Sequence, residues 1–215
     1  MKNVDKVVVK KQIDDLLYQA YETELGGVEI YKMAILCAAN DELKEEWTKY
    51  LEQTVKHVAI ARGMLDALGM DPEATTPGRQ IVREKAKCLL SAMQKALKDA
   101  PQAAQIVAAE CVVDAETKDH GNWQLIGALA EKSTGVMKKA LTEAFREVSA
   151  EEDEHLYHNK GWTRELWLES LGLPAQLPPL EEKRHVQSAT AAARVAEERE
   201  PKVKEEGPRR PHKKS

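Results

Sequence analysis

Proline is absent from two long stretches of this chain, and that distribution constrains the fold more than any other feature. No proline precedes Pro72, and none lies between Pro101 and Pro174. Because a proline inside an α-helix removes a hydrogen bond and clashes with the preceding turn, both stretches can form long helices. Aromatic residues make up only 5% of the chain, which is low for a β-sandwich or a β-barrel. We therefore expect an all-α protein.

The chain changes character after Pro174. Residues 175–215 hold ten Lys or Arg and seven Asp or Glu, a net charge of +3, whereas the whole chain carries −4. The part before this point therefore carries −7. A charged segment that is rich in proline and poor in apolar residues cannot offset the entropy lost on ordering. We expect a helical bundle over residues 1–174 and a flexible tail over residues 175–215, within which a short helix could form over residues 189–200.

Hydrophobic periodicity predicts five helices in the first part. They are expected over about residues 11–38, 41–68, 77–100, 102–131 and 136–171, with Asn40 and Thr76 as caps of the second and third. In the third helix, Ile81, Cys88 and Leu89 are expected on one apolar face. The connection between the first and second helices is short, and so is the one between the fourth and fifth. Each pair is therefore expected to form an antiparallel hairpin, and the third helix would join the two hairpins as a crossover. This is the plan of a ferritin-like four-helix bundle.

Six polar residues interrupt the apolar stripes of the four bundle helices. They are Glu24, His57, Glu116, His120, Glu152 and His155. A charged group on a core-facing stripe is costly unless it is paired, hydrogen-bonded or bound to metal. Glu152 and His155 form a Glu-x-x-His word, and residues three apart share one helix face. Carboxylates together with imidazoles suit iron or manganese, and also zinc, so we predict that all six are metal ligands.

Neighbouring residues compete for some of these positions. Glu151 could replace Glu152, because it too shares a face with His155. His158 is expected in a supporting or surface position. Asp119, three residues after Glu116, is an outside candidate for a ligand.

Several short words along the chain resemble the ferritin-like superfamily, and within it the YciE/YciF-type stress-associated helical bundles. They are Tyr21-Glu22-Thr23-Glu24, Tyr50-Leu51-Glu52-Gln53-Thr54, the segment Ala108–Glu116 and the pair Glu151-Glu152. The resemblance covers roughly Gln12 to Leu156. It implies one or two iron or manganese ions, dioxygen or peroxide as the reacting partner, iron oxidation or peroxide removal as the reaction, and a homodimer.

The chain departs from that group in three places. Thr54 stands where related di-iron proteins have a glutamate before the histidine. His57 replaces an amide, and His120 stands near a position that tends to hold tyrosine. His120 could supply the missing ligand, which would give a set of three glutamates and three histidines.

Two other functions remain open from the sequence. Thr54 is compatible with a bundle that has lost its site and acts as a dimeric stress or interaction protein. The basic tail would allow a Dps-like, nucleic-acid-associated protein, which the −7 charge of the bundle disfavours. Three widely spaced cysteines, and the lack of an apolar run of membrane-spanning length or of a secretory signal, predict a reduced, cytoplasmic protein without a membrane segment.

Overall fold

The computed structural model describes residues 3–175, and this part of the chain is helical without strands. Its helices are α1 (Asn3–Cys37), α2 (Asp41–Ala67), α3 (Pro77–Asp99), α4 (Ala104–Lys132) and α5 (Gly135–Ser170), with a short 3-10 turn, η1 (Pro101–Ala103), before α4. The all-α prediction is thereby confirmed. Apart from residue 175, the predicted tail and its short helix lie outside the described residues.

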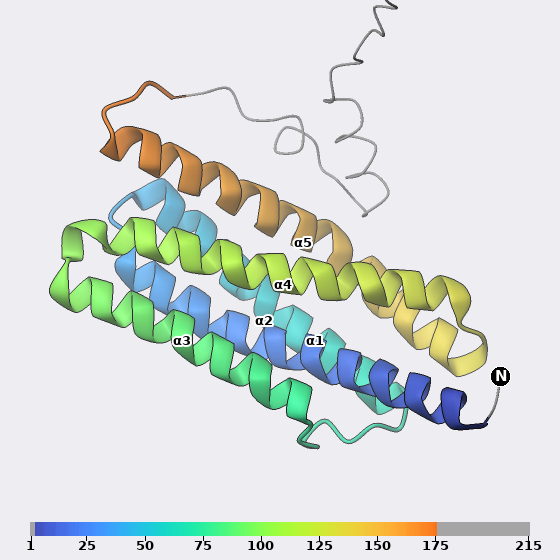
Figure 1. Ribbon diagram of the computed structural model, residues 1–215. Coiled ribbons are helices and arrows are strands. Elements are labelled where there is room, and N and C mark those ends of the chain that lie inside the picture. Colours follow the sequence, from blue (N-terminus) through green and yellow to red (C-terminus); the bar gives the residue numbers. More distant parts are fainter. Residues whose placement is uncertain (1–2, 176–215) are drawn as a thin grey trace, which may run out of the picture.

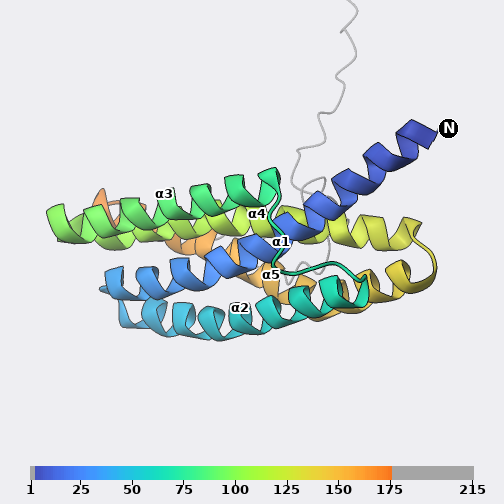
Figure 2. The ribbon, with the colours of Figure 1, turned by 90° about the horizontal axis from the view of Figure 1, so that it is seen from below.

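Four of the helices form a closed ring of contacts, and the fifth lies outside it. α1 packs on α2 and α4, and α5 packs on the same two helices, while α3 covers one side of α1 and α4. α1 and α2 run in opposite directions, as do α4 and α5 (Figures 1 and 2). α2 and α4 run the same way, because the connection between them crosses the length of the bundle through α3 (Figure 1).

The boundaries of α2 and α3 follow from caps that are readable in the sequence. The Asn40 side chain accepts a hydrogen bond from the Leu43 N–H at 3.0 Å, and the Thr76 hydroxyl accepts one from the Arg79 N–H at 3.1 Å. Each cap satisfies an N–H that has no partner within the helix. Pro77 occupies the first turn of α3, where its missing N–H costs nothing.

The predicted start of the first helix was wrong, and the predicted face of the third was wrong for Ile81 and Cys88, although Leu89 does pack against the core. α1 begins at Asn3 rather than near Lys11, because residues 3–10 contain neither proline nor glycine to stop the helix. In α3, Ile81 is 58% exposed and Cys88 is exposed, whereas Arg79, Val82 and Met93 are buried. α3 contacts the bundle along one narrow side only. A prediction that is off by one residue along the helix therefore assigns an exposed residue, such as Ile81, to the buried face.

A polar layer divides the hydrophobic core into two clusters. One contains Ile30, Trp47 and Val112, and the other contains Leu17, Leu65 and Trp123. On α1, α2 and α4, buried polar residues lie between the members of the two clusters, and on α5 they follow Val148. The centre of the bundle is therefore polar while both ends are apolar.

None of the helices within residues 3–175 combines the length and apolar character needed to cross a membrane. Cys37, Cys88 and Cys111 are free thiols.

Candidate metal centre

Five of the six predicted ligands meet in the polar layer. Glu24 comes from α1, His57 from α2, Glu116 from α4, and Glu152 with His155 from α5. All five are buried, and none is more than 5% exposed. The heptad-like stripes of the four helices bring these residues to the same depth because each stripe faces the bundle axis.

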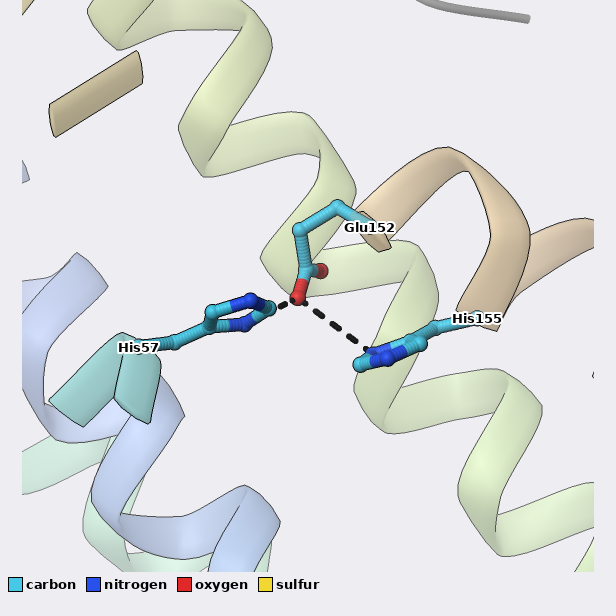
Figure 3. Close-up of side chains that lie close together, drawn as sticks. All are labelled: His57, Glu152 and His155. Atoms are coloured by element: carbon cyan, nitrogen blue, oxygen red, sulfur yellow. Dashed lines mark ion pairs between the residues drawn. The ribbon is translucent and has the colours of Figure 1, made fainter. Parts of the chain in front are cut away.

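Glu152 lies between the two imidazole rings (Figure 3). Its Oε1 atom is 3.0 Å from Nδ1 of His57 and 3.5 Å from Nδ1 of His155. The two rings are stacked, with centroids 5.6 Å apart. One donor atom from each of the three residues lies within 4.8 Å of the others, a spacing that a single metal ion could bridge.

The outer nitrogen of each ring is held by an acceptor. Nε2 of His57 is 2.8 Å from Oε2 of Glu151, and Nε2 of His155 is 3.0 Å from Oε1 of Gln53. A carboxylate and an amide oxygen accept hydrogen bonds, so both Nε2 atoms carry the proton. In a neutral ring this leaves the Nδ1 lone pair directed at the centre. A ring N–H held by an acceptor on the far side is typical of metal-binding histidines. Glu151, predicted as a rival to Glu152, is thus a positioning residue for His57.

Glu24, Asp119 and Glu152 form a second group of converging donor atoms, again within 4.8 Å of one another. Oε1 of Glu24 accepts a hydrogen bond from the Trp123 indole at 2.8 Å, and Oε2 of Glu24 is 3.7 Å from Nδ1 of His57. Glu152 belongs to both groups and therefore links them.

Glu116 completes the layer on the side of His155. The Tyr31 hydroxyl donates to its Oε1 atom at 2.7 Å, and its Oε2 atom is 3.8 Å from Nδ1 of His155. The Asn159 amide donates to the Tyr31 hydroxyl at 3.3 Å and accepts from the Trp47 indole at 2.7 Å. This chain of hydrogen bonds fixes the direction in which Glu116 points.

Six donor atoms facing this centre have no hydrogen-bond partner. They are Oε2 of Glu24, Nδ1 of His57, Oε2 of Glu116, Oδ1 of Asp119, Oε2 of Glu152 and Nδ1 of His155. A buried polar atom without a partner costs about 1–3 kcal/mol, more when it is charged. A cation bound among these facing side chains would give such atoms a partner. The donor set fits iron or manganese, since it joins carboxylate oxygens to imidazoles without thiolates.

The acid–base properties of the centre reflect crowded negative charge. Burial first, and the neighbouring carboxylates second, raise the pKa of Glu24, Glu116 and Asp119 well above the usual range. Burial acts in the same sense on Glu152, but the imidazoles of His155 and His57 outweigh it and hold the pKa of Glu152 at about 2. Burial lowers the pKa of His57, yet Glu152 and Glu151 outweigh it and raise that pKa.

The structure places His120, the sixth predicted ligand, outside both groups of donor atoms. Its Nε2 atom is 2.7 Å from Oδ1 of Asp153, and its ring makes an edge contact with Tyr157. Successive residues point about 100° apart around a helix, so Asp119 and His120 cannot both face the centre. Asp119 faces it, three residues after Glu116. The spacing to Glu116 was the only sequence signal for Asp119.

Thr54 and His158 have hydrogen-bond partners outside the two groups of donor atoms. The Thr54 hydroxyl donates to the Tyr50 carbonyl of its own helix at 2.9 Å, so it satisfies the helix rather than the centre. His158 is half-buried, and its Nδ1 atom lies 2.8 Å from both Oε1 of Glu46 and the Tyr50 hydroxyl. It belongs to a network at the edge of the bundle.

Comparison of the chain with protein-family models, with curated proteins and with solved structures finds no match.

Proposed function

We propose that this chain is a ferritin-like metalloprotein that binds iron or manganese in the polar layer and uses it in a reaction with dioxygen or peroxide. The observation that carries the proposal is the orientation of the two histidines. His57 and His155 both direct Nδ1 at Glu152, and both have Nε2 held from behind, by Glu151 and Gln53. Two imidazoles aimed at one carboxylate, each held from behind by an acceptor, are the arrangement that a metal ion bound by all three residues requires.

The donor residues of the proposed site are His57, Glu152 and His155, with Glu24 and Glu116 adjacent. When bound, iron or manganese would supply reversible one-electron oxidation and coordination positions for a small oxidant. The two hydrophobic clusters on either side keep bulk water out of the layer. Trp123 and Tyr31 hold Glu24 and Glu116 in place, so little reorganisation is needed when the charge of the centre changes.

Glu151 connects the layer to solvent. Its side chain is 37% exposed, and its Oε2 atom contacts the buried Nε2 atom of His57. The carboxylate accepts the hydrogen bond from Nε2 of His57, so it holds this ring with Nδ1 directed at the centre. The contact that orients His57 therefore lies at the edge of the layer, next to solvent.

The decisive experiment is a metal count. The full chain is loaded anaerobically with ferrous iron or manganese, desalted and measured by elemental analysis. We expect metal to be retained by the natural chain and by His120→Ala, and to be lost in the double variant Glu152→Ala/His155→Ala. The control is matched because His120 is also buried and paired with a carboxylate. No retention in the natural chain, or retention unchanged in the double variant, would contradict the proposal.

The second candidate is a bundle of the same fold that carries no metal and acts as a structural or interaction protein. Thr54 favours it, because its hydroxyl bonds to the helix and offers no ligand. The same metal count separates the two functions. Loaded protein would then be tested for oxygen consumption with ferrous iron and for peroxide removal, and sedimentation would test the proposed homodimer.

A further inference from the structure

Asp119 is a buried acid that forms no ion pair with a lysine or arginine in the described part of the chain. It is 6% exposed and lies on α4 one turn after Glu116. Lys118 is its chain neighbour, but the Lys118 ammonium donates to the Asn122 side chain. No ion pair within residues 9–175 joins a lysine or arginine to Asp119 or Glu24.

Each acid of the group formed by Glu24, Asp119 and Glu152 has one oxygen atom without a partner. Oδ1 of Asp119, Oε2 of Glu24 and Oε2 of Glu152 are each buried without a hydrogen-bond partner. Oε1 of Glu24 accepts a hydrogen bond from the Trp123 indole, and Oε1 of Glu152 lies 3.0 and 3.5 Å from the Nδ1 atoms of His57 and His155. In both glutamates Oε1 is thus engaged elsewhere in the layer, and Oε2 is left without a partner.

The charge that the layer acquires on metal binding sets how many divalent ions it can balance. Once metal has displaced their protons, the carboxylates of Glu24, Glu116, Asp119 and Glu152 would carry −4 between them, and imidazoles that bind through Nδ1 would be neutral. One divalent ion leaves half of that charge uncompensated in a low-dielectric interior, whereas two divalent ions balance it. Glu152, which is shared by both donor groups, is the natural bridge between two ions.

We propose that Asp119 is a metal ligand that completes a second metal position with Glu24 and Glu152, beside the position formed by His57, Glu152 and His155. The chain then binds two divalent ions. Asp119 on α4 would then supply the fourth carboxylate of the layer. In related di-iron proteins a glutamate at the position of Thr54 on α2 supplies it. This inference rests on the proposed function, since a chain that binds no metal has neither position.

The test is metal stoichiometry in three forms of the full chain: natural, Asp119→Asn and Asp114→Asn. Asparagine keeps the size of the side chain and removes its charge, and Asp114 is an exposed aspartate on the same helix. We expect two manganese ions per chain in the natural protein and in Asp114→Asn, and one in Asp119→Asn. Electron paramagnetic resonance should show the coupled signal of a manganese pair in the first two, and an isolated ion in the third.

Each other outcome has a definite meaning. No metal in any form contradicts the proposed function itself. One ion in the natural chain, or two ions that persist in Asp119→Asn, overturns the second position while leaving metal binding intact. If Asp119→Asn fails to fold, as judged by circular dichroism, Asp119→Ser is counted in its place.

Discussion

The amide oxygen of Gln53 lies 3.0 Å from Nε2 of His155, and this contact decides which nitrogen of the ring faces the centre of the bundle. Gln53 and His155 come from different helices, so the ring is oriented across the interface between α2 and α5. Hydrogen bonds of this kind fix the tautomer of a ligand histidine and raise its basicity.

Replacing Gln53 with leucine should weaken metal binding without unfolding the bundle. The substitution keeps the volume of the side chain and removes the acceptor behind His155. Loss of such a supporting contact typically lowers metal affinity by about 10–100-fold. Chelator competition with manganese measures the change, and Gln80→Leu, at an exposed position on α3, is the control. Equal affinities in the two variants would show that Gln53 does not act through His155.

Metal binding should release protons and weaken as the solution becomes acidic. The pKa values of Glu24, Glu116 and Asp119 are raised, mainly by burial, and the charges of Glu152 and Glu151 raise that of His57. Groups with raised pKa values hold protons at a pH where ordinary side chains have lost them, and a metal ion must displace these protons. Metal affinity should therefore increase with pH until the pH exceeds the raised pKa values of these groups. Calorimetry in buffers of different ionisation enthalpy counts the protons, and a count of zero would contradict the expectation.

Glu22→Gln should destabilise the bundle far more than Glu29→Gln. The Glu22 carboxylate accepts hydrogen bonds from Arg79 at 2.6 Å and from Arg83 at 2.6 and 2.9 Å, and both Glu22 and Arg79 are buried. Removing one partner of a buried ion pair costs about 3–5 kcal/mol. Glu29, on the same helix, pairs only with Lys32 at the surface, so its loss should cost less than about 0.5 kcal/mol.

The contribution of Glu22 should also depend on pH. Burial opposes ionisation, but the hydrogen bonds from Arg83 and Arg79 outweigh it and lower the pKa of Glu22 in the folded chain. The stabilisation is therefore complete above the pKa of a glutamate in the unfolded chain and is lost as the pH falls through the lower folded value. The difference in unfolding free energy between the natural chain and Glu22→Gln, measured by urea titration, should shrink on acidification. A difference that stays constant would show that the carboxylate charge is not the cause.

Two glycine substitutions on α4 should have opposite effects. A Cβ atom at Gly127 would lie 2.7 Å from Cε2 of Phe145, so Gly127→Ala must displace that ring and should cost about 1–3 kcal/mol. A Cβ atom at Gly121 meets nothing within 4 Å, so Gly121→Ala should stabilise the helix by about 0.5–1 kcal/mol. Thermal unfolding of the metal-free variants measures both, and a shift of the same sign in each would contradict the packing argument.

The features that could be predicted from the sequence are those that depend on short-range chemistry. Asn40 and Thr76 are caps whose effect is local, and the proline-free stretches contain helices of the expected kind. The shared burial of Glu24, His57, Glu116, Glu152 and His155 could be predicted because each interrupts an apolar stripe, a pattern that needs no knowledge of the neighbouring helix.

The errors have a common physical cause, which is the orientation of a helix about its own axis. Whether Asp119 or His120 faces the centre depends on how α4 is rotated against α1 and α5, and both residues are polar and adjacent. Ile81 was misplaced for the same reason, because α3 touches the bundle along one side only. The supporting contacts of Gln53 and Glu151 join helices far apart in the chain, so no local pattern could reveal them.

The polar layer takes donors from α1, α2, α4 and α5, and this distribution affects the order of events during synthesis. Glu152 and His155 are made after the other donors, and they lie at the meeting point of the layer. A growing chain that has produced only the first hairpin carries Glu24 and His57 but lacks their central partner. A reactive metal ion should therefore find no complete site on an unfinished polypeptide, and capture should wait until the last helix has docked.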